Sequence, residues 1–368
     1  MRLQSSFVLA ASAAALAACG QPAQKQAAAP PAPATPVVQP APAPGALDPQ
    51  GVDQAAFSAE ALQSGDRAPS VVRAQVLLDR ARFSPGMIDG TMGENVRQAI
   101  AAYEEANGLP VDGQLDEAVF QKLTAADAAP VLTQYVVTDK DVAGPFVQVP
   151  KDDIVGQSKL PHLGYQNVAE ALAERFHMTE ELLQALNPGA DLTKAGTTIT
   201  VAAVSDDKLP TQVATIEVDK QEKAVRALDK DGKLIAFYPA TIGSEEMPAP
   251  GGAWKVAGVA HEPTYTFDPK RLTYKQQGVT ERTTVKAGPN NPVGVVWIDL
   301  TKDTYGIHGT PEPREVGKVS SHGCVRLTNW DAEELSTGVK TGVKVTFLEK
   351  SSDSALRLAK APAASRAT

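Results

Sequence analysis

The chain has 368 residues, which is enough for two or three domains and a connecting segment. Its formal net charge is −8, and its lysines and arginines are not gathered in a stripe along the sequence. Because binding to nucleic acid depends on clustered positive charge, this distribution argues against a nucleic-acid partner. The two cysteines are Cys19 and Cys324, so the sequence offers no framework of disulfide bonds.

Residues 1–18 carry one charge, Arg2, followed by an apolar run from Phe7 to Ala18. The run is too short to span a bilayer and is typical of a secretory signal peptide. It ends in Leu-Ala-Ala-Cys19, which resembles a bacterial lipobox and implies that Cys19 becomes the lipid-modified first residue. An ordinary signal peptide with an incidental cysteine is the alternative. Since Gly20 follows instead of aspartate, the inner-membrane retention signal is missing, and we expect a periplasmic protein anchored in the outer membrane.

Residues 19–65 form an Ala- and Pro-rich segment in which residues 20–50 are mostly alanine, proline and glutamine. Such a composition supplies few side chains that could build a core, so we expect an unfolded or partly polyproline-II tether. A linker without a tuned length is the alternative. Residues 351–368 are rich in alanine, serine and charge, and we expect a disordered tail there.

Residues 66–127 have the pattern of a small helical domain. Apolar residues recur at helical spacing in three segments, which predicts three amphipathic helices. These residues are Val72, Val76 and Phe83, then Val96, Ile100 and Tyr103, then Val119 and Leu123. The connections hold two near-copies of one turn, Ile88-Asp89-Gly90 and Val111-Asp112-Gly113. The arrangement resembles the three-helix peptidoglycan-binding domain of many wall enzymes; a helical spacer is the alternative.

Residues 132–205 resemble a divergent LysM-like module with both helix and strand. Tyr135-Val136-Val137 predicts the first strand and Ile199-Thr200-Val201 the closing strand. Residues 168–186 predict a helix between them, ended by an Asn-Pro-Gly turn. Residues 142–165 form a long segment where LysM modules have a brief turn, so glycan binding and a scaffolding role are equal alternatives.

Residues 210–350 predict a mostly β domain, either a sandwich or a compact barrel-like sheet. Residues 213–218 alternate as in a strand, and residues 233–242 follow an Asp-Gly turn, so we expect these two segments to form a hairpin. Further strands are expected at residues 254–260, 293–300 and 343–348.

A helix and a long irregular segment are also expected in this domain. Thr328 and Asp331 fit a capping pattern, which predicts a short helix directly after the cysteine. Residues 261–287 are polar and charged, which is consistent with a lid over the site or with an ordinary surface excursion.

Cys324 is the remaining thiol, and it follows a histidine in Ser321-His322-Gly323-Cys324. A free thiol is mostly protonated at neutral pH, and an imidazole can take its proton and later return it to a leaving group. If residues 322–324 are extended, His322 and Cys324 point to the same face. His308 reaches the same place if the loop 309–321, which contains glycines and prolines, folds back.

A zinc site made by Cys324, His308 and His322 is an alternative to catalysis, as is a buried core cysteine. Zinc takes three or four protein ligands, so the set is possible by number. The sequence shows no metal-type spacing elsewhere, and we therefore expect neither a metal nor another cofactor.

Two ordered blocks resemble the signature of the YkuD-type L,D-transpeptidases, cysteine enzymes that cross-link bacterial peptidoglycan. The blocks are Tyr-Gly-Ile-His-Gly-Thr at 305–310 and Ser-His-Gly-Cys-Val-Arg-Leu-Thr-Asn-Trp-Asp at 321–331. The Pro-Gly-Gly run at 250–252 and residues 288–294 resemble upstream landmarks of the family. The resemblance covers about residues 210–350 and implies a YkuD-like β-sandwich with a short helix after the nucleophile.

The resemblance also implies a role for each residue of the site. Cys324 is the nucleophile, and His308 is the proton acceptor, oriented by the backbone carbonyl of Gly309. His322 is a second imidazole near the oxyanion or the substrate, and the sequence alone does not rank the two histidines.

The remaining implied roles concern the oxyanion and the substrate. The amides of Gly323 and Cys324 would hold the tetrahedral oxygen, because donors placed there stabilise acyl-transfer intermediates. Arg326 would bind a carboxylate of the peptide stem, and a salt bridge to Asp331 is the alternative.

The expected reaction is a 3→3 cross-link between diaminopimelate residues, made through a Cys324 thioester with peptidoglycan stem peptides as donor and acceptor. An L,D-carboxypeptidase, endopeptidase or hydrolase acting on wall-attached peptides at the same site is one alternative. A non-catalytic lipoprotein that anchors peptidoglycan, held to the membrane through Cys19, is the other.

Overall fold

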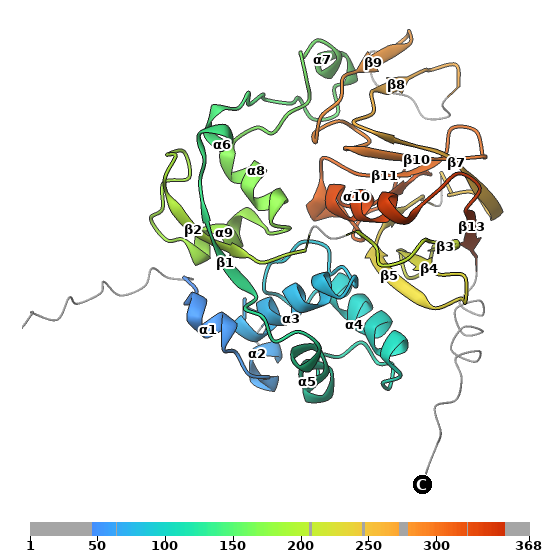
Figure 1. Cartoon of the computed structure of the whole chain (residues 1–368). Helices are drawn as coiled ribbons and strands as arrows, with labels where there is room; N and C mark the ends of the chain where they lie inside the picture. The colour runs from blue at the N-terminus through green and yellow to red at the C-terminus, as the bar shows by residue number, and fades with distance from the viewer. Residues whose placement is uncertain are drawn as a thin grey trace, which may run out of the picture. The chain divides into compact units, whose positions relative to one another are not determined.

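Figure 1 shows the computed structural model, which describes residues 46–349 apart from 64, 206–207, 245–246, 272–278 and 322. The described residues all fall within one compact unit. The predicted signal peptide, Cys19, His322 and the 351–368 tail lie outside the described residues. Within the described ranges, no helix is both long and apolar enough to cross a membrane.

The N-terminal helical domain contains the three predicted helices, α3 (Pro69–Arg80), α4 (Glu94–Asn107) and α5 (Glu117–Ala126). Its two similar turns are held in the same way, by a buried acceptor on the preceding helix. Gln75 Oε1 accepts from the N–H groups of Asp89 (3.2 Å) and Gly90 (2.7 Å). Glu104 Oε2 accepts the equivalent N–H groups of the second turn, both at 2.9 Å. The repeated turn sequence therefore has a structural cause.

Part of the segment predicted as an unfolded tether is folded. Helices α1 (Pro49–Asp53) and α2 (Ala59–Gln63) lie within it. Asp48 caps α1 by accepting from the Gly51 N–H at 2.9 Å, and Val52 is fully buried. The tether prediction is therefore wrong for residues 46–63. It rested on the composition of the whole segment and took no account of the Asp48 cap or of the buried Val52.

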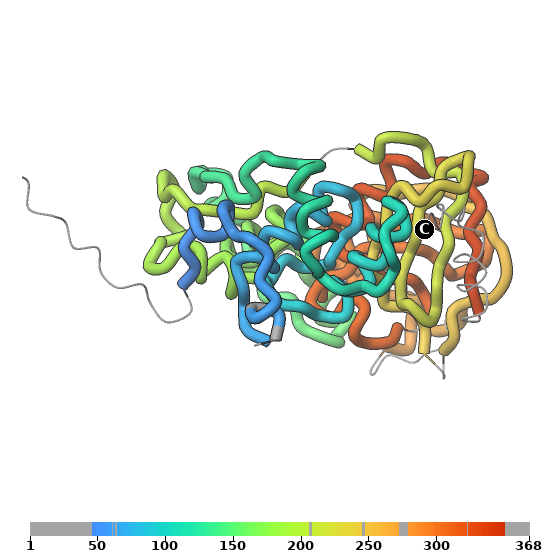
Figure 2. Tube along the Cα trace, turned by 90° about the horizontal axis from the view of Figure 1, so that it is seen from below, coloured from blue at the N-terminus to red at the C-terminus, as the bar shows by residue number. Residues whose placement is uncertain are grey.

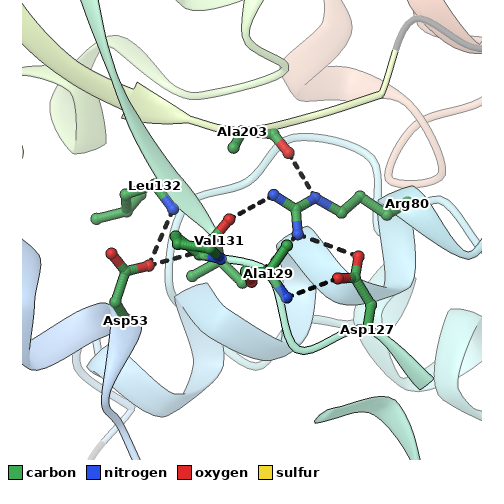
Figure 3. A network of polar contacts seen from close by, with 8 residues as sticks. Asp53, Arg80, Asp127, Ala129, Val131, Leu132 and Ala203 are labelled. Carbon is green, nitrogen blue, oxygen red and sulfur yellow. Dashed lines mark hydrogen bonds and ion pairs between the residues drawn. The ribbon is translucent and has the colours of Figure 1, made fainter. Parts of the chain in front are cut away.

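Figure 3 shows the polar network that joins α1 and the helical domain to the following module. Asp53 accepts from the N–H groups of Val131 (2.8 Å) and Leu132 (3.0 Å). Arg80 donates to the carbonyl of Ala203 at 2.6 Å and forms an ion pair with Asp127 at 3.1 Å. These partly buried bonds connect the two parts of the chain.

The middle module is built on strands β1 (Leu132–Val136) and β2 (Thr198–Ala202), which pair antiparallel. Between them lie α6 (Asp139–Ala143), α7 (Ile154–Ser158), α8 (Val168–Arg175) and α9 (Glu180–Leu186). Residues 168–186 thus form two helices instead of the predicted one. The break has a local cause, since Thr179 accepts from the Leu182 N–H at 3.2 Å and so begins α9 as an N-cap.

The C-terminal domain is mostly β, as predicted. Its large sheet has the order β5-β4-β3-β13-β7-β10-β11-β12-β6. The strands are β3 (Thr215–Asp219), β4 (Ala224–Leu228), β5 (Leu234–Pro239), β6 (Thr241–Ile242), β7 (Gly252–His261), β10 (Val296–Leu300), β11 (Gly306–His308), β12 (Val325–Arg326) and β13 (Lys344–Leu348). The edge strands β5 and β6 are separated in sequence by Ala240 alone, so the sheet must curl until its edges approach each other.

The predicted hairpin between residues 213–218 and 233–242 is not formed. Strand β3 pairs with β4, and β4 pairs with β5. Strand β4 was hidden in the sequence by a buried charge, Arg226, which forms ion pairs with Glu105 of α4 and with Glu222. A buried charge is tolerated where it is paired, and that partner comes from another domain.

The helical domain covers the exposed edge of β5. The Ser84 N–H donates to the Phe237 carbonyl at 2.9 Å, and the Phe237 N–H donates to the Arg82 carbonyl at 2.8 Å. Figures 1 and 2 both show α4 beside β5. Covering an edge strand removes unpaired backbone groups that could pair with another chain.

The predicted lid segment contains a second, smaller hairpin, β8 (Tyr265–Phe267) and β9 (Thr283–Val285). Phe267 and Val285 form a small core with Ile154 and Leu163 of the middle module. The long segment 142–165 is thereby anchored on the C-terminal domain. Whether this hairpin acts as a lid stays a prediction.

Candidate active site

The sheet register brings the predicted site residues together. Strands β11 and β12 run parallel, with His308 opposite Arg326, and β10 places Trp297 opposite His308 on the other side. Side chains of register partners share a face of the sheet, and so do residues two apart on an extended chain. Cys324 lies in a bend directly before β12, so the register places it on the segment next to β11, the strand that carries His308.

Helix α10 (Asn329–Gly338) follows β12, as the capping pattern predicts. Thr328 Oγ1 accepts from the Asp331 N–H at 3.2 Å. A short 3₁₀ helix, Pro313–Glu315, lies in the loop between His308 and the cysteine. The loop thus folds back as expected and returns the chain to β11.

His308 is held as a neutral base. Its side chain is buried at 3% exposure, and Nδ1 lies 2.6 Å from the Gly309 carbonyl. A carbonyl oxygen can only accept, so Nδ1 carries the proton and Nε2 keeps its lone pair. Burial, helped by the positive charge of Arg326, lowers the pKa of His308 to about 3, and the hydrogen bond to Gly309 opposes this only in part. The ring stacks on Trp297 with 5.4 Å between centroids.

Cys324 is a free, half-buried thiol. Its Sγ donates to the Thr304 carbonyl at 3.8 Å. Burial raises the pKa of Cys324, while a backbone hydrogen bond from Gly306 and the charge of Arg326 favour the thiolate and limit the shift. The resting site therefore holds a protonated thiol and a neutral imidazole instead of a preformed ion pair.

The loop that carries the cysteine is fixed by Ser321, which is buried. Ser321 Oγ donates to the Cys324 carbonyl at 2.5 Å and accepts from the Gly323 N–H at 3.2 Å. The Gly323 amide, predicted to be an oxyanion donor, is thus already engaged in the resting structure. To serve that role it would have to leave the Ser321 hydroxyl.

Gly323 has φ of 111°, a region that favours glycine. A Cβ built at this position would lie 3.0 Å from Cε1 of Tyr305. The glycine is therefore required both by the backbone conformation and by the close packing of the Tyr305 ring.

Arg326 is half-buried and forms no ion pair with an acid of the described residues. Asp331, the alternative partner from the sequence, accepts instead from Ser84 Oγ at 3.0 Å. The guanidinium is thus positioned to influence both His308 and Cys324 and has no described carboxylate of its own.

His322, the third ligand of the alternative zinc site, lies outside the described residues. Among the residues that the structure does describe, no three His, Cys, Asp or Glu side chains are grouped as a metal site would require.

Sequence reasoning missed Trp297 and Thr304 at this site. Trp297 is placed beside His308 by the register of β10 against β11. Thr304, whose carbonyl accepts from Cys324 Sγ, has a left-handed backbone conformation with φ of 66°. Neither feature leaves a pattern in the sequence.

Two family models match parts of the chain. Residues 214–346 match the family model YkuD, described as "L,D-transpeptidase catalytic domain", and residues 67–123 match "Putative peptidoglycan binding domain". The chain therefore contains a YkuD L,D-transpeptidase catalytic domain preceded by a domain of the peptidoglycan-binding type.

Individual relatives carry related names. The chain is 28% identical over 181 residues to "Putative L,D-transpeptidase YkuD" of Bacillus licheniformis, an alignment that covers 48% of this chain and 92% of that protein. It is 31% identical over 206 residues to "Probable L,D-transpeptidase ErfK/SrfK" of Escherichia coli, covering 54% of this chain and 65% of the relative. The chain thus spans less than two thirds of the second relative.

Among solved structures, L,D-transpeptidase 3 from Mycobacterium tuberculosis aligns with a TM-score of 0.31 and 16% identity. The alignment covers 42% of this chain and 76% of that one. The assignment of the catalytic domain does not depend on this alignment.

Proposed function

We propose that the chain is an L,D-transpeptidase that forms 3→3 peptidoglycan cross-links through a thioester on Cys324. The observation that carries the proposal is the state of His308 on β11, the strand that pairs with β12 directly after Cys324 in a YkuD domain. The imidazole is held neutral, with Nε2 able to accept a proton. A base in this state is what a protonated thiol needs in order to react.

The proposed reaction has two acyl transfers. His308 takes the thiol proton while Cys324 attacks the carbonyl at the L-centre of diaminopimelate in a donor tetrapeptide stem. The proton passes to the amine of the terminal D-Ala, which leaves, and a thioester remains. The amine at the D-centre of an acceptor stem then attacks the thioester and gives a proton to His308. His308 passes this proton to the departing sulfur, which restores the Cys324 thiol.

The remaining site residues have supporting roles in this proposal. Arg326 binds a carboxylate of the stem, which is consistent with its lack of an ion pair among the described residues. The Cys324 amide, with Gly323 once it leaves Ser321, stabilises the oxyanion. His322 is a second imidazole near the substrate.

The N-terminal parts would hold the enzyme on its substrate. The helical domain binds peptidoglycan, in keeping with the family match. The middle module is a divergent LysM-like module; its support is the antiparallel β1–β2 pair with α8 and α9 between the strands in sequence. Lipid modification of Cys19 and an outer-membrane location in the periplasm complete the proposal.

The test is incubation of the purified protein with tetrapeptide-bearing muropeptides, followed by mass spectrometry of the products. We expect dimers with a 3→3 linkage, and none from Cys324→Ala. Dimers from the Cys324→Ala protein would contradict the mechanism. Monomeric tripeptides without dimers would favour the hydrolase alternative.

A second measurement separates the non-catalytic alternative. Carbapenems acylate the family that the sequence resembles, so we expect one carbapenem adduct, located on Cys324 by peptide mapping. Absence of the adduct from protein that is folded by circular dichroism would favour a peptidoglycan-anchoring lipoprotein.

A further inference from the structure

Helix α8 of the middle module contacts the catalytic domain through two glutamates. Glu170 and Glu174 are four residues apart and so lie on one face of the helix. Glu170 Oε1 accepts from Asn290 Nδ2 at 2.8 Å, and Glu174 Oε1 accepts from Asn329 Nδ2 at 2.6 Å. Both asparagines are buried and belong to the catalytic domain. The two bonds form a paired docking contact.

Of the two asparagines, Asn329 lies against Gly309, whose carbonyl accepts a hydrogen bond from His308. Its Oδ1 accepts from the Val295 N–H at 3.2 Å, and its Nδ2 also donates to the Pro289 carbonyl at 3.1 Å. The same Oδ1 is 2.2 Å from the position that a Cβ on Gly309 would occupy. The side chain of Asn329 is therefore packed directly on the Gly309 backbone.

Gly309 is the residue whose carbonyl fixes the tautomer of His308, at 2.6 Å from Nδ1. A shift of Asn329 would free space beside Gly309 and loosen that carbonyl. We infer that Glu174 and Asn329 are positioning residues for His308, so that docking of the middle module sets the orientation of the catalytic base. This inference rests on the proposed function for its kinetic consequences but not for its structural ones.

The electrostatics of Glu174 support the inference. Burial raises the pKa of Glu174 to about 8, so at neutral pH the side chain is largely a neutral acid that still offers a carbonyl oxygen to Asn329. Glutamine offers the same acceptor at the same place, whereas leucine leaves the Asn329 amide without it. Glu174→Gln and Glu174→Leu therefore form a matched pair.

The first test reads the tautomer directly. In full-length protein with ¹⁵N-labelled histidine, long-range ¹H–¹⁵N spectra should show His308 protonated at Nδ1 in the wild type and in Glu174→Gln. In Glu174→Leu we expect a mixture of tautomers or exchange broadening. An unchanged His308 tautomer in Glu174→Leu would overturn the inference, whether or not the protein proves to be a transpeptidase.

The second test is kinetic. The rate of carbapenem acylation of Cys324 should fall at least about tenfold in Glu174→Leu, since small misplacements of a catalytic group cost this much or more. In Glu174→Gln the rate should stay within about twofold, because the acceptor to Asn329 is retained. Glu170→Leu is the control, because it removes the neighbouring docking bond but not the one to Asn329.

Equal loss of acylation in Glu170→Leu and Glu174→Leu would mean that docking alone matters and would overturn the role assigned to Asn329. Thermal unfolding of each variant shows that the compared proteins are folded. If no muropeptide dimers form but the tautomer changes as expected, the proposed function fails and the positioning role stands.

Discussion

His308 and Arg326 are register partners on the parallel strands β11 and β12. The positive charge of Arg326 acts on both reacting groups, lowering the pKa of the His308 imidazole and favouring the thiolate of Cys324. Burial is the main reason that the base is unprotonated; the arginine adds to this effect and also makes the nucleophile easier to ionise.

Replacing Arg326 should separate these effects from substrate binding. In Arg326→Gln we expect alkylation of Cys324 by iodoacetamide, which is uncharged, to slow by about threefold to tenfold at pH 8, since one pKa unit corresponds to a tenfold change in thiolate. Arg326→Lys keeps the charge and should react at nearly the wild-type rate. Equal rates in Arg326→Gln and the wild type would show that the charge of Arg326 does not affect the pKa of Cys324.

The pH dependence of acylation follows from the two pKa shifts. Because the pKa of His308 is lowered to about 3, the imidazole stays neutral at every pH above 5, and no loss of rate from its protonation is expected there. Because the pKa of Cys324 is raised, the thiol stays protonated through neutral pH, so attack assisted by His308 should proceed at a constant rate between pH 5 and 8. Carbapenem acylation followed across this range is the measurement. An inflection near pH 6.5 with a plateau above it would instead indicate a preformed thiolate–imidazolium pair.

Stability should also depend on pH, through buried acids beside α10. Burial raises the pKa of Asp331 from 3.8 to about 8 and that of Glu334 from 4.5 to about 7. A carboxyl whose pKa is raised on folding stabilises the protein fully below its unfolded pKa and loses that contribution as pH rises through its folded pKa. We therefore expect the unfolding midpoint to fall as pH rises from 6.5 to 8 and to level off above the folded pKa values.

Asp331→Asn provides the comparison for this prediction. The amide keeps an acceptor for Ser84 Oγ and cannot ionise, so the decline between pH 6.5 and 8 should become shallower. His308 has the opposite sign and acts below pH 6.5, outside the measured window. Urea unfolding at pH 6.5, 7.5 and 9 tests the prediction, and a midpoint that rises with pH would contradict it.

The sequence predicted most of the architecture where a local pattern carries it. Alternating residues located β3, β7 and β13, and the Thr328 cap located α10. The pattern failed at β4 because Arg226 is paired by a glutamate 121 positions away. The prediction failed at residues 46–63 because this segment is held by a distant contact, in which Asp53 accepts from the N–H group of Val131.

At the site, the sequence indicated candidate residues but not their states. The two blocks around His308 and Cys324 indicated both residues and the orienting carbonyl of Gly309. That the Gly323 amide is already bound by Ser321, and that Glu174 reaches Asn329 across 155 positions, follow from tertiary packing alone. Such contacts are fixed by the docking of separate modules, which leaves no periodic pattern in the sequence.

The last prediction concerns Gly323, which sits directly before the nucleophile. Gly323→Ala places a methyl group at φ of 111° and 3.0 Å from the Tyr305 ring, so the loop must shift. Strain of this kind costs about 1–3 kcal/mol, and it falls on the segment that positions Cys324. We expect carbapenem acylation to slow by at least about tenfold, since the sulfur moves relative to His308.

Gly342→Ala is the matched control for Gly323→Ala. Gly342 also has a positive φ, 94°, but a Cβ there meets nothing within 4 Å. Both variants should lower the unfolding temperature by a similar amount, because both place a side chain in the left-handed region. Only Gly323→Ala should slow acylation; an equal loss in Gly342→Ala would show that the effect is a general one on folding, and an unchanged rate in Gly323→Ala would show that the loop tolerates the methyl group.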